Sequence, residues 1–133
     1  MLTIRDPTDA DRIGDPSVRS LVRRRLAEVL DGEPYQPDIH GDFVVVEPGD
    51  TAAALEEATG TPILTNPFDG SRFPAPEFAP VCEFIEDHGG CYEAYFLYSD
   101  DGAGVAVFVP KSEGIDAELL SLCRQFAEPA LTR

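Results

Sequence analysis

Three runs of strand-forming residues in the second half of the chain constrain its fold more than any other feature. Residues 81–86, 91–99 and 104–109 are rich in β-branched and aromatic side chains. The turn sequences Asp-His-Gly-Gly and Asp-Asp-Gly separate them. Short strands joined by turns that contain glycine form antiparallel hairpins. The sequence therefore predicts an antiparallel three-stranded meander over residues 81–109.

The two turns also predict a register for this meander. Centring the first turn pairs Glu86 with Cys91, and centring the second pairs Ala94 with Val109. One face is then apolar apart from Glu83, and we predict that it is core. The opposite face is mixed and consists of Cys82, Phe84, Glu86, Cys91, Glu93, Tyr95, Leu97, Ala106 and Phe108. Because a slip of one residue exchanges the two faces, this assignment depends on the register.

Three segments have the pattern of amphipathic helices. Residues 16–31 carry apolar side chains at intervals of three or four, which is helical spacing, and shorter helices are expected over 51–59 and 116–127. Each of the three segments follows or begins at an aspartate that can cap it. These capping residues are Asp15, Asp50 and Asp116.

Two further short strands are predicted near residues 42–47 and 61–65, where apolar residues are followed by turn residues. Residues 1–14 have the composition of a polar N-terminal arm, and residues 15–133 are long enough for one domain. We therefore predict a single α+β domain in which the meander is extended by the two short strands. The helices are expected to pack mainly on one face of the sheet.

Negative charge dominates the composition. The chain has 25 acidic and 10 basic residues, and its formal net charge is −15. Such a molecule repels phosphate backbones and anionic lipids, so we predict neither nucleic acid nor membrane as a partner. The three cysteines are scattered and odd in number, which is typical of a reducing, cytosolic setting. Adaptation to a high-salt cytoplasm would explain the same acidity without any partner.

His88 and Cys91 are the local pair with nucleophile or metal chemistry. An imidazole beside a thiol can activate it, whereas Asp87 and Glu86 would raise the pKa of the thiol and oppose that activation. A zinc site needs three or four convergent ligands, and His88 with the two nearest cysteines is too small a set. We therefore expect no metal, no cofactor and no catalytic residue, and keep His88 and Cys91 as a candidate polar site.

The mixed face of the meander is the candidate binding surface. Its candidate residues are Phe84, Glu93, Tyr95 and Phe108. The face is interpreted either as a contact for a protein or a second copy of the chain, or as a second core layer covered by a helix. Arg19 and Arg23 on the first helix are further candidates, which would contact a partner or neutralise the acidic body of the molecule.

These observations predict a small acidic cytosolic module for protein interaction or regulation, without catalytic activity. The partner would be another protein or a second copy of the chain. One alternative is an acidic inhibitor that mimics nucleic acid and blocks a basic protein. Another is a small enzyme that uses His88 and Cys91.

Overall fold

The computed structural model of the protein describes residues 1–4, 6–36, 40–59, 82–97 and 104–129. The strands among these residues are β1 (Leu2–Ile4), β2 (Asp42–Val45), β3 (Cys82–Asp87), β4 (Cys91–Leu97), β5 (Gly104–Pro110) and β6 (Glu128–Pro129). The helices are the 3-10 helix η1 (Pro7–Arg12) and the α-helices α1 (Pro16–Leu30), α3 (Ala52–Thr59) and α4 (Ala117–Phe126).

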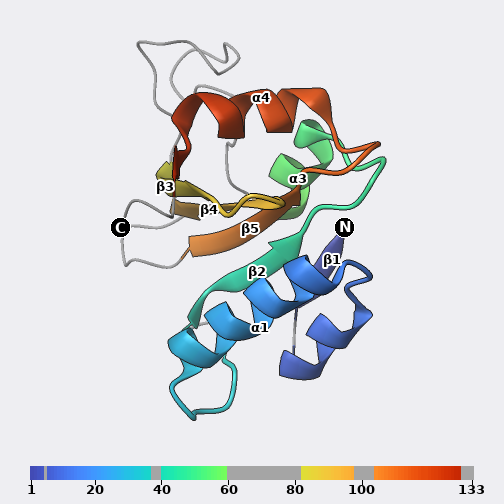
Figure 1. Ribbon diagram of the computed structural model, residues 1–133. Helices are drawn as coiled ribbons and strands as arrows, with labels where there is room; N and C mark the ends of the chain where they lie inside the picture. Colours follow the sequence, from blue (N-terminus) through green and yellow to red (C-terminus); the bar gives the residue numbers. More distant parts are fainter. Residues whose placement is uncertain (5, 37–39, 60–81, 98–103, 130–133) are drawn as a thin grey trace.

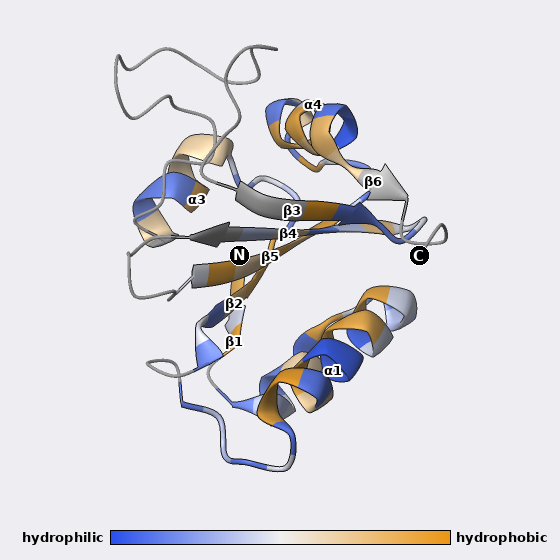
Figure 2. Ribbon diagram, turned by 90° about the vertical axis from the view of Figure 1, so that its left-hand side faces the viewer, coloured by the Kyte–Doolittle hydropathy of each residue, from blue (hydrophilic) through white to orange (hydrophobic). Residues whose placement is uncertain are grey.

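The strands form one mixed sheet with helices on both of its faces. The six strands of the described residues lie in the order β1-β2-β5-β4-β3-β6. Figure 1 shows α1 on one side of the sheet and α3 and α4 on the other, and Figure 2 shows the same layers from the side. The predicted α+β class is confirmed. The expectation that helices cover mainly one face is wrong, because both faces of the central strand β5 are apolar and need cover.

The predicted meander is confirmed as the antiparallel strands β3, β4 and β5. Its register differs from the prediction by two residues, since Glu86 pairs with Glu93 and Ala94 with Val107. The cause in the first hairpin is a turn centred one residue later than expected, with Gly89 at a φ of 93°. A shift of two residues keeps the described side chains on their predicted faces. The register changes again between Cys82 and Phe84, and Cys82 pairs with Phe96.

The predicted strand near 42–47 is confirmed as β2, which pairs in parallel with β5. The predicted strand near 61–65 lies outside the described residues. At the two edges of the sheet, β1 pairs antiparallel with β2 and β6 pairs in parallel with β3. The sheet is thus assembled from segments at both ends of the described chain.

Residues 1–14 differ from the expected polar arm. They form β1 and η1, and Ile4, Ala10 and Ile13 are buried. Asp6 caps η1 by accepting a hydrogen bond from the backbone N–H of Thr8. The apolar residues of this segment therefore belong to the core and close one edge of the sheet.

The three predicted helices are confirmed, with ends within one residue of the expected ones. Asp15 caps α1 as predicted, through bonds from the N–H groups of Ser17 and Val18. The other two caps differ. The hydroxyl of Thr51 caps α3, and Asp50 instead accepts a bond from the N–H of Glu47. Asp116 makes no cap bond to α4, because its carboxylate accepts the N–H of Ala52 and ties α4 to α3.

Two hydrophobic clusters fill the space between the sheet and its helices. The cluster on the α3 and α4 side contains the described apolar residues of the predicted core face, including Ile85, Ala94 and Val107. The cluster on the α1 side contains Cys91, Ala106 and Phe108 from the mixed face. The described part of the mixed face therefore contributes to a second core layer, covered by α1 and η1. None of the helices in the described segments is long and apolar enough to cross a bilayer.

Candidate functional site

A carboxylate lies in the interior on the α1 side of the sheet. Glu93 of β4 is 1% exposed and is the one charged side chain among the buried residues that the structure describes. A carboxylate in such a place is costly to bury unless cations or hydrogen-bond donors surround it. The partners of Glu93 therefore define the polar centre of the molecule.

Arg25 of α1 binds this carboxylate at two points. Its Nε donates to Glu93 Oε2 at 2.5 Å and its Nη2 donates to Oε1 at 2.9 Å. Its Nη1 donates to Glu28 on the same helix at 2.9 Å. The hydrogen bonds with Glu93 raise the pKa of Arg25 despite its partial burial. Arg25 is therefore a permanent cation that joins α1 to the sheet.

His88 and Glu86 complete the cluster from the β3–β4 hairpin. His88 Nε2 lies 2.9 Å from Glu93 Oε1 and 3.6 Å from Glu86 Oε2. Glu86 and Glu93 are directly opposite each other on neighbouring strands. Like charges in that position destabilise a sheet unless something compensates them. The imidazole of His88 and the guanidinium of Arg25 lie beside the two carboxylates, where compensation is needed. We call Arg25, Glu86, His88 and Glu93 the buried cluster.

Cys91 lies next to the buried cluster but is held in an unreactive state. It is 3% exposed, and its Sγ donates to the carbonyl oxygen of Tyr92. Burial, with the nearby Glu93 charge as a smaller cause, raises the pKa of the Cys91 thiol to about 12. Little thiolate exists at neutral pH under these conditions. The pairing of His88 with Cys91 as base and nucleophile therefore finds no support in this geometry.

Two pockets of about 270 Å³ each flank the buried cluster. The Tyr95 pocket is lined by Arg25, Glu93 and Tyr95, and by residues of β2. The Ser20 pocket lies between the first half of α1 and the β3–β4 turn, and its lining includes Ser20 and His88. The buried cluster is therefore reached from two sides.

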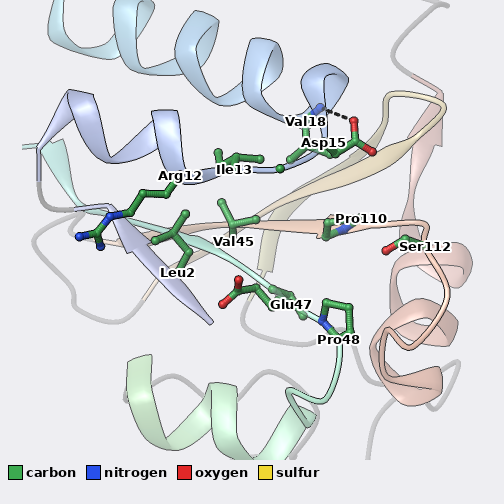
Figure 3. Close-up of a pocket in the computed structure, with 12 residues that line it drawn as sticks. Leu2, Arg12, Ile13, Asp15, Val18, Val45, Glu47, Pro48, Pro110 and Ser112 are labelled. Carbon is green, nitrogen blue, oxygen red and sulfur yellow. Dashed lines mark hydrogen bonds between the residues drawn. The ribbon is translucent and has the colours of Figure 1, made fainter.

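A third pocket, of about 220 Å³, lies away from the buried cluster between η1, β2 and the start of α1. In Figure 3 the side chains of Leu2, Ile13 and Val45 lie close together there, and the guanidinium of Arg12 points away from them. None of its lining residues belongs to the buried cluster. The lining is mainly apolar, so it offers a ligand apolar contacts rather than reactive groups.

The candidate binding residues of the mixed face have different positions. Phe108 is 0% exposed beneath α1, so its ring is not accessible to a partner and its proposed contact role is corrected. Glu93 is likewise interior. Tyr95 is partly buried against the α1-side cluster and lines its pocket. The side chain of Phe84 lies outside the described part of the chain.

The candidate arginines of α1 bind the molecule's own backbone and acids. Arg19 donates to the carbonyl oxygens of Ile13 and Gly14, which fixes the turn between η1 and α1. Arg23 is exposed and pairs with Asp11 of η1. Arg23 therefore has an acidic partner within the molecule, whereas Arg19 bonds to backbone carbonyl oxygens.

Arg25 and the role of Glu86 were not predicted from the sequence. A signal for Arg25 was present, since it follows Leu21 by four residues and Val22 by three. Both of those residues are buried, so Arg25 lies beside the buried stripe of α1. Glu86 was missed because the predicted register placed Cys91 opposite it instead of Glu93.

No family model matches this chain, and neither the curated proteins nor the solved structures contain a significant match to it.

Proposed function

We propose that the protein is a small acidic interaction or regulatory module that binds a cationic surface of a protein partner and catalyses no reaction itself. The observation that carries this proposal is the distribution of charge between the two helical layers. Segments 47–57 and 111–126, on the α3 and α4 side, contain seven acidic and two basic residues. Segment 6–30, on the α1 side, contains five of each.

Several acids on the α3 and α4 side have their side chains at the surface. Glu57 and Glu113 are exposed, and Glu118 in the first turn of α4 is exposed as well. A surface with an excess of one sign attracts partners of the opposite sign and accelerates their encounter. We call this surface the acidic layer. Its partner would present lysine or arginine side chains.

The state of Cys91 supports a binding role over the alternative of a small enzyme. The thiol is buried with a pKa of about 12, and His88 bonds to Glu93. No described feature favours His88 and Cys91 as a catalytic pair. Self-association remains a form of the binding proposal, in which the partner is a second copy of the chain.

Affinity capture from a native lysate, followed by mass spectrometry, tests the proposal. Glu57→Lys and Glu113→Lys each change the net charge by the same amount as the control Glu33→Lys, which lies outside the acidic layer at an exposed position. We expect the first two variants to lose the captured partner and the control to retain it. Capture should also weaken as ionic strength rises from about 0.1 M to about 1 M, where the Debye length falls from about 10 Å to about 3 Å.

The outcomes separate the proposal from its rivals. If duplex DNA displaces the captured protein, the module acts as a mimic of nucleic acid. Light scattering that gives a doubled mass identifies a second copy as the partner. Equal loss of capture in all three variants would show that total charge, and not the acidic layer, governs binding, and the proposal would then fail.

A further inference from the structure

We propose that Glu86, His88 and Glu93 form a binding site for one divalent transition-metal ion, with Zn²⁺ as the best-matched ion. The three side chains offer one imidazole nitrogen and two carboxylate oxygens, all within 4.8 Å of one another. This site is independent of the acidic layer, and it adds a ligand to the proposed interaction module.

The spacing of the three donor atoms fits a zinc ion. Bonds of about 2.0–2.2 Å in a tetrahedral site place neighbouring donors roughly 3.4 Å apart. His88 Nε2 lies 2.9 Å from the Glu93 oxygen and 3.6 Å from the Glu86 oxygen. An ion at this position would require the first separation to widen by about 0.5 Å and the second to narrow by about 0.2 Å. The neutral imidazole then carries its proton on Nδ1, so that Nε2 is free to bind the ion.

The backbone of the β3–β4 hairpin holds the donors in place. Glu86 and Glu93 are partners in the strand register. The turn that carries His88 is fixed by the bond from His88 N–H to Cys91 O, at 2.9 Å. The carboxylate of Asp87 accepts the N–H of Gly89 at 2.9 Å and fixes the turn further. A site held by paired strands and a tight turn loses little conformational freedom when an ion binds.

The electrostatics of the cluster favour a divalent cation. Glu86 and Glu93 are formally anionic and Arg25 is cationic, so the buried cluster with His88 as a neutral metal ligand carries a surplus of negative charge. Arg25 donates to both carboxylate oxygens of Glu93 and leaves one lone pair of Oε1 directed toward His88. An outer-shell partner that orients a metal ligand has this arrangement. A divalent ion would offset the surplus at the one place where the three donors converge.

The donor set selects the class of metal. An imidazole nitrogen with carboxylate oxygens suits zinc and its neighbours in the first transition row, whereas calcium and magnesium prefer oxygen alone. His88 and Glu86 are each 16% exposed, so solvent reaches the site. With three protein ligands, the fourth position would hold water, which is the arrangement of an open zinc site.

Calorimetric titration of the purified full chain with Zn²⁺, in an excess of Mg²⁺ that saturates unspecific carboxylate binding, tests the site. We expect one ion per chain. His88→Gln and Glu86→Gln should each weaken binding at least about tenfold, which is the minimum effect seen even for outer-shell partners. The matched control Glu33→Gln removes an exposed acid outside the β3–β4 hairpin and the buried cluster, and it should leave the affinity unchanged.

Two further readouts keep the result decisive. Co²⁺ in place of Zn²⁺ should give the visible absorption of a four-coordinate site in the wild type and lose it in His88→Gln. Zn²⁺ should also raise the unfolding temperature of the wild type more than that of Glu86→Gln, since an ion that binds the folded state stabilises it. Titrations that are the same for the wild type and both variants, or that show no stoichiometric binding, would overturn the site. Neither result depends on the acidic layer.

Discussion

Arg25 of α1 and Glu93 of β4 form a two-point ion pair across the boundary between helix and sheet, with Nε–Oε2 and Nη2–Oε1 distances of 2.5 Å and 2.9 Å. A guanidinium matches a carboxylate in this paired geometry, and a lysine would not. The pair is the polar centre of the core on the α1 side. It couples the position of α1 to the β3–β4 hairpin, which also carries His88.

Arg25→Met should lower the free energy of unfolding by about 3 kcal/mol, because it leaves Glu93 as a buried charge without its main partner. Breaking a buried ion pair costs about 3–5 kcal/mol, and the low end of that range applies because Arg25 is partly exposed. The measurement is urea unfolding followed by circular dichroism. Adding Glu93→Met to the same chain should recover most of the loss. A cost below about 1 kcal/mol would instead identify the pair as equivalent to a surface ion pair.

Cys91 should resist alkylation in the folded protein. Its thiol is buried and has a pKa of about 12, so the reactive thiolate is scarce at neutral pH. Treatment with iodoacetamide at neutral pH, followed by peptide mass spectrometry, should show Cys91 unmodified until denaturant is added. Rapid modification without denaturant would contradict this and would reopen the enzyme alternative.

Phe108→Ala should lower the free energy of unfolding by about 3–5 kcal/mol, because the ring is fully buried between β5 and α1. Val29→Ala on the same helical layer is a suitable control, since Val29 is 36% exposed. We expect it to change stability by no more than about 0.5 kcal/mol. Similar effects of the two substitutions in urea unfolding would show that α1 does not cover Phe108.

Gly41→Ala should cost about 2 kcal/mol or more, since Gly41 has a φ of 81° that residues with a Cβ rarely adopt. A Cβ there would also lie 2.8 Å from the carbonyl oxygen of Gly104 at the start of β5. Gly14→Ala is the matched control, because an added Cβ meets nothing within 4 Å. In thermal unfolding, the unfolding temperature of Gly41→Ala should lie clearly below those of the control and the wild type.

Stability should fall in acid, in part because of Asp15. Hydrogen bonds from the hydroxyl and N–H of Ser17 and from the N–H of Val18 lower the pKa of Asp15 below its ordinary value of 3.8. Because folding lowers this pKa, the stabilisation that ionised Asp15 provides is complete above pH 3.8. It is lost as the pH falls through the pKa of the folded state. Asp15→Asn keeps an acceptor that does not titrate, so its unfolding midpoint should depend less on pH in this range. Parallel pH curves for the two proteins would refute this assignment.

The meander could be predicted from sequence because its turns and its alternation of side chains are local signals. Glycine at positions 89 and 90 marks the first turn, and the continuous run of β-branched and aromatic residues in β5 identifies a strand. The register was wrong by two residues, yet the faces were right, because the side-chain period of a strand is two. The amphipathic helices were predictable because the spacing of their apolar residues is also a local signal.

The first fourteen residues were not predictable as part of the fold. Ile4, Ala10 and Ile13 are buried, but β1 and η1 are too short for a periodic pattern to stand out among the charged residues. Their burial depends on β2 and α1, which are tertiary neighbours. The buried cluster was missed for a related reason, since Arg25 and Glu93 meet only once α1 lies on the sheet.

The position of β5 between β2 and β4 has a consequence for biosynthesis. Because β5 pairs in parallel with β2 and antiparallel with β4, it joins the early and late parts of the chain and contributes to both hydrophobic clusters. Until β5 has been synthesised, β2 has an open edge and α1 has no complete layer to cover. Acquisition of the native state must therefore wait until β5 has emerged, and the late synthesis of this central strand makes non-local pairing the slow step of folding.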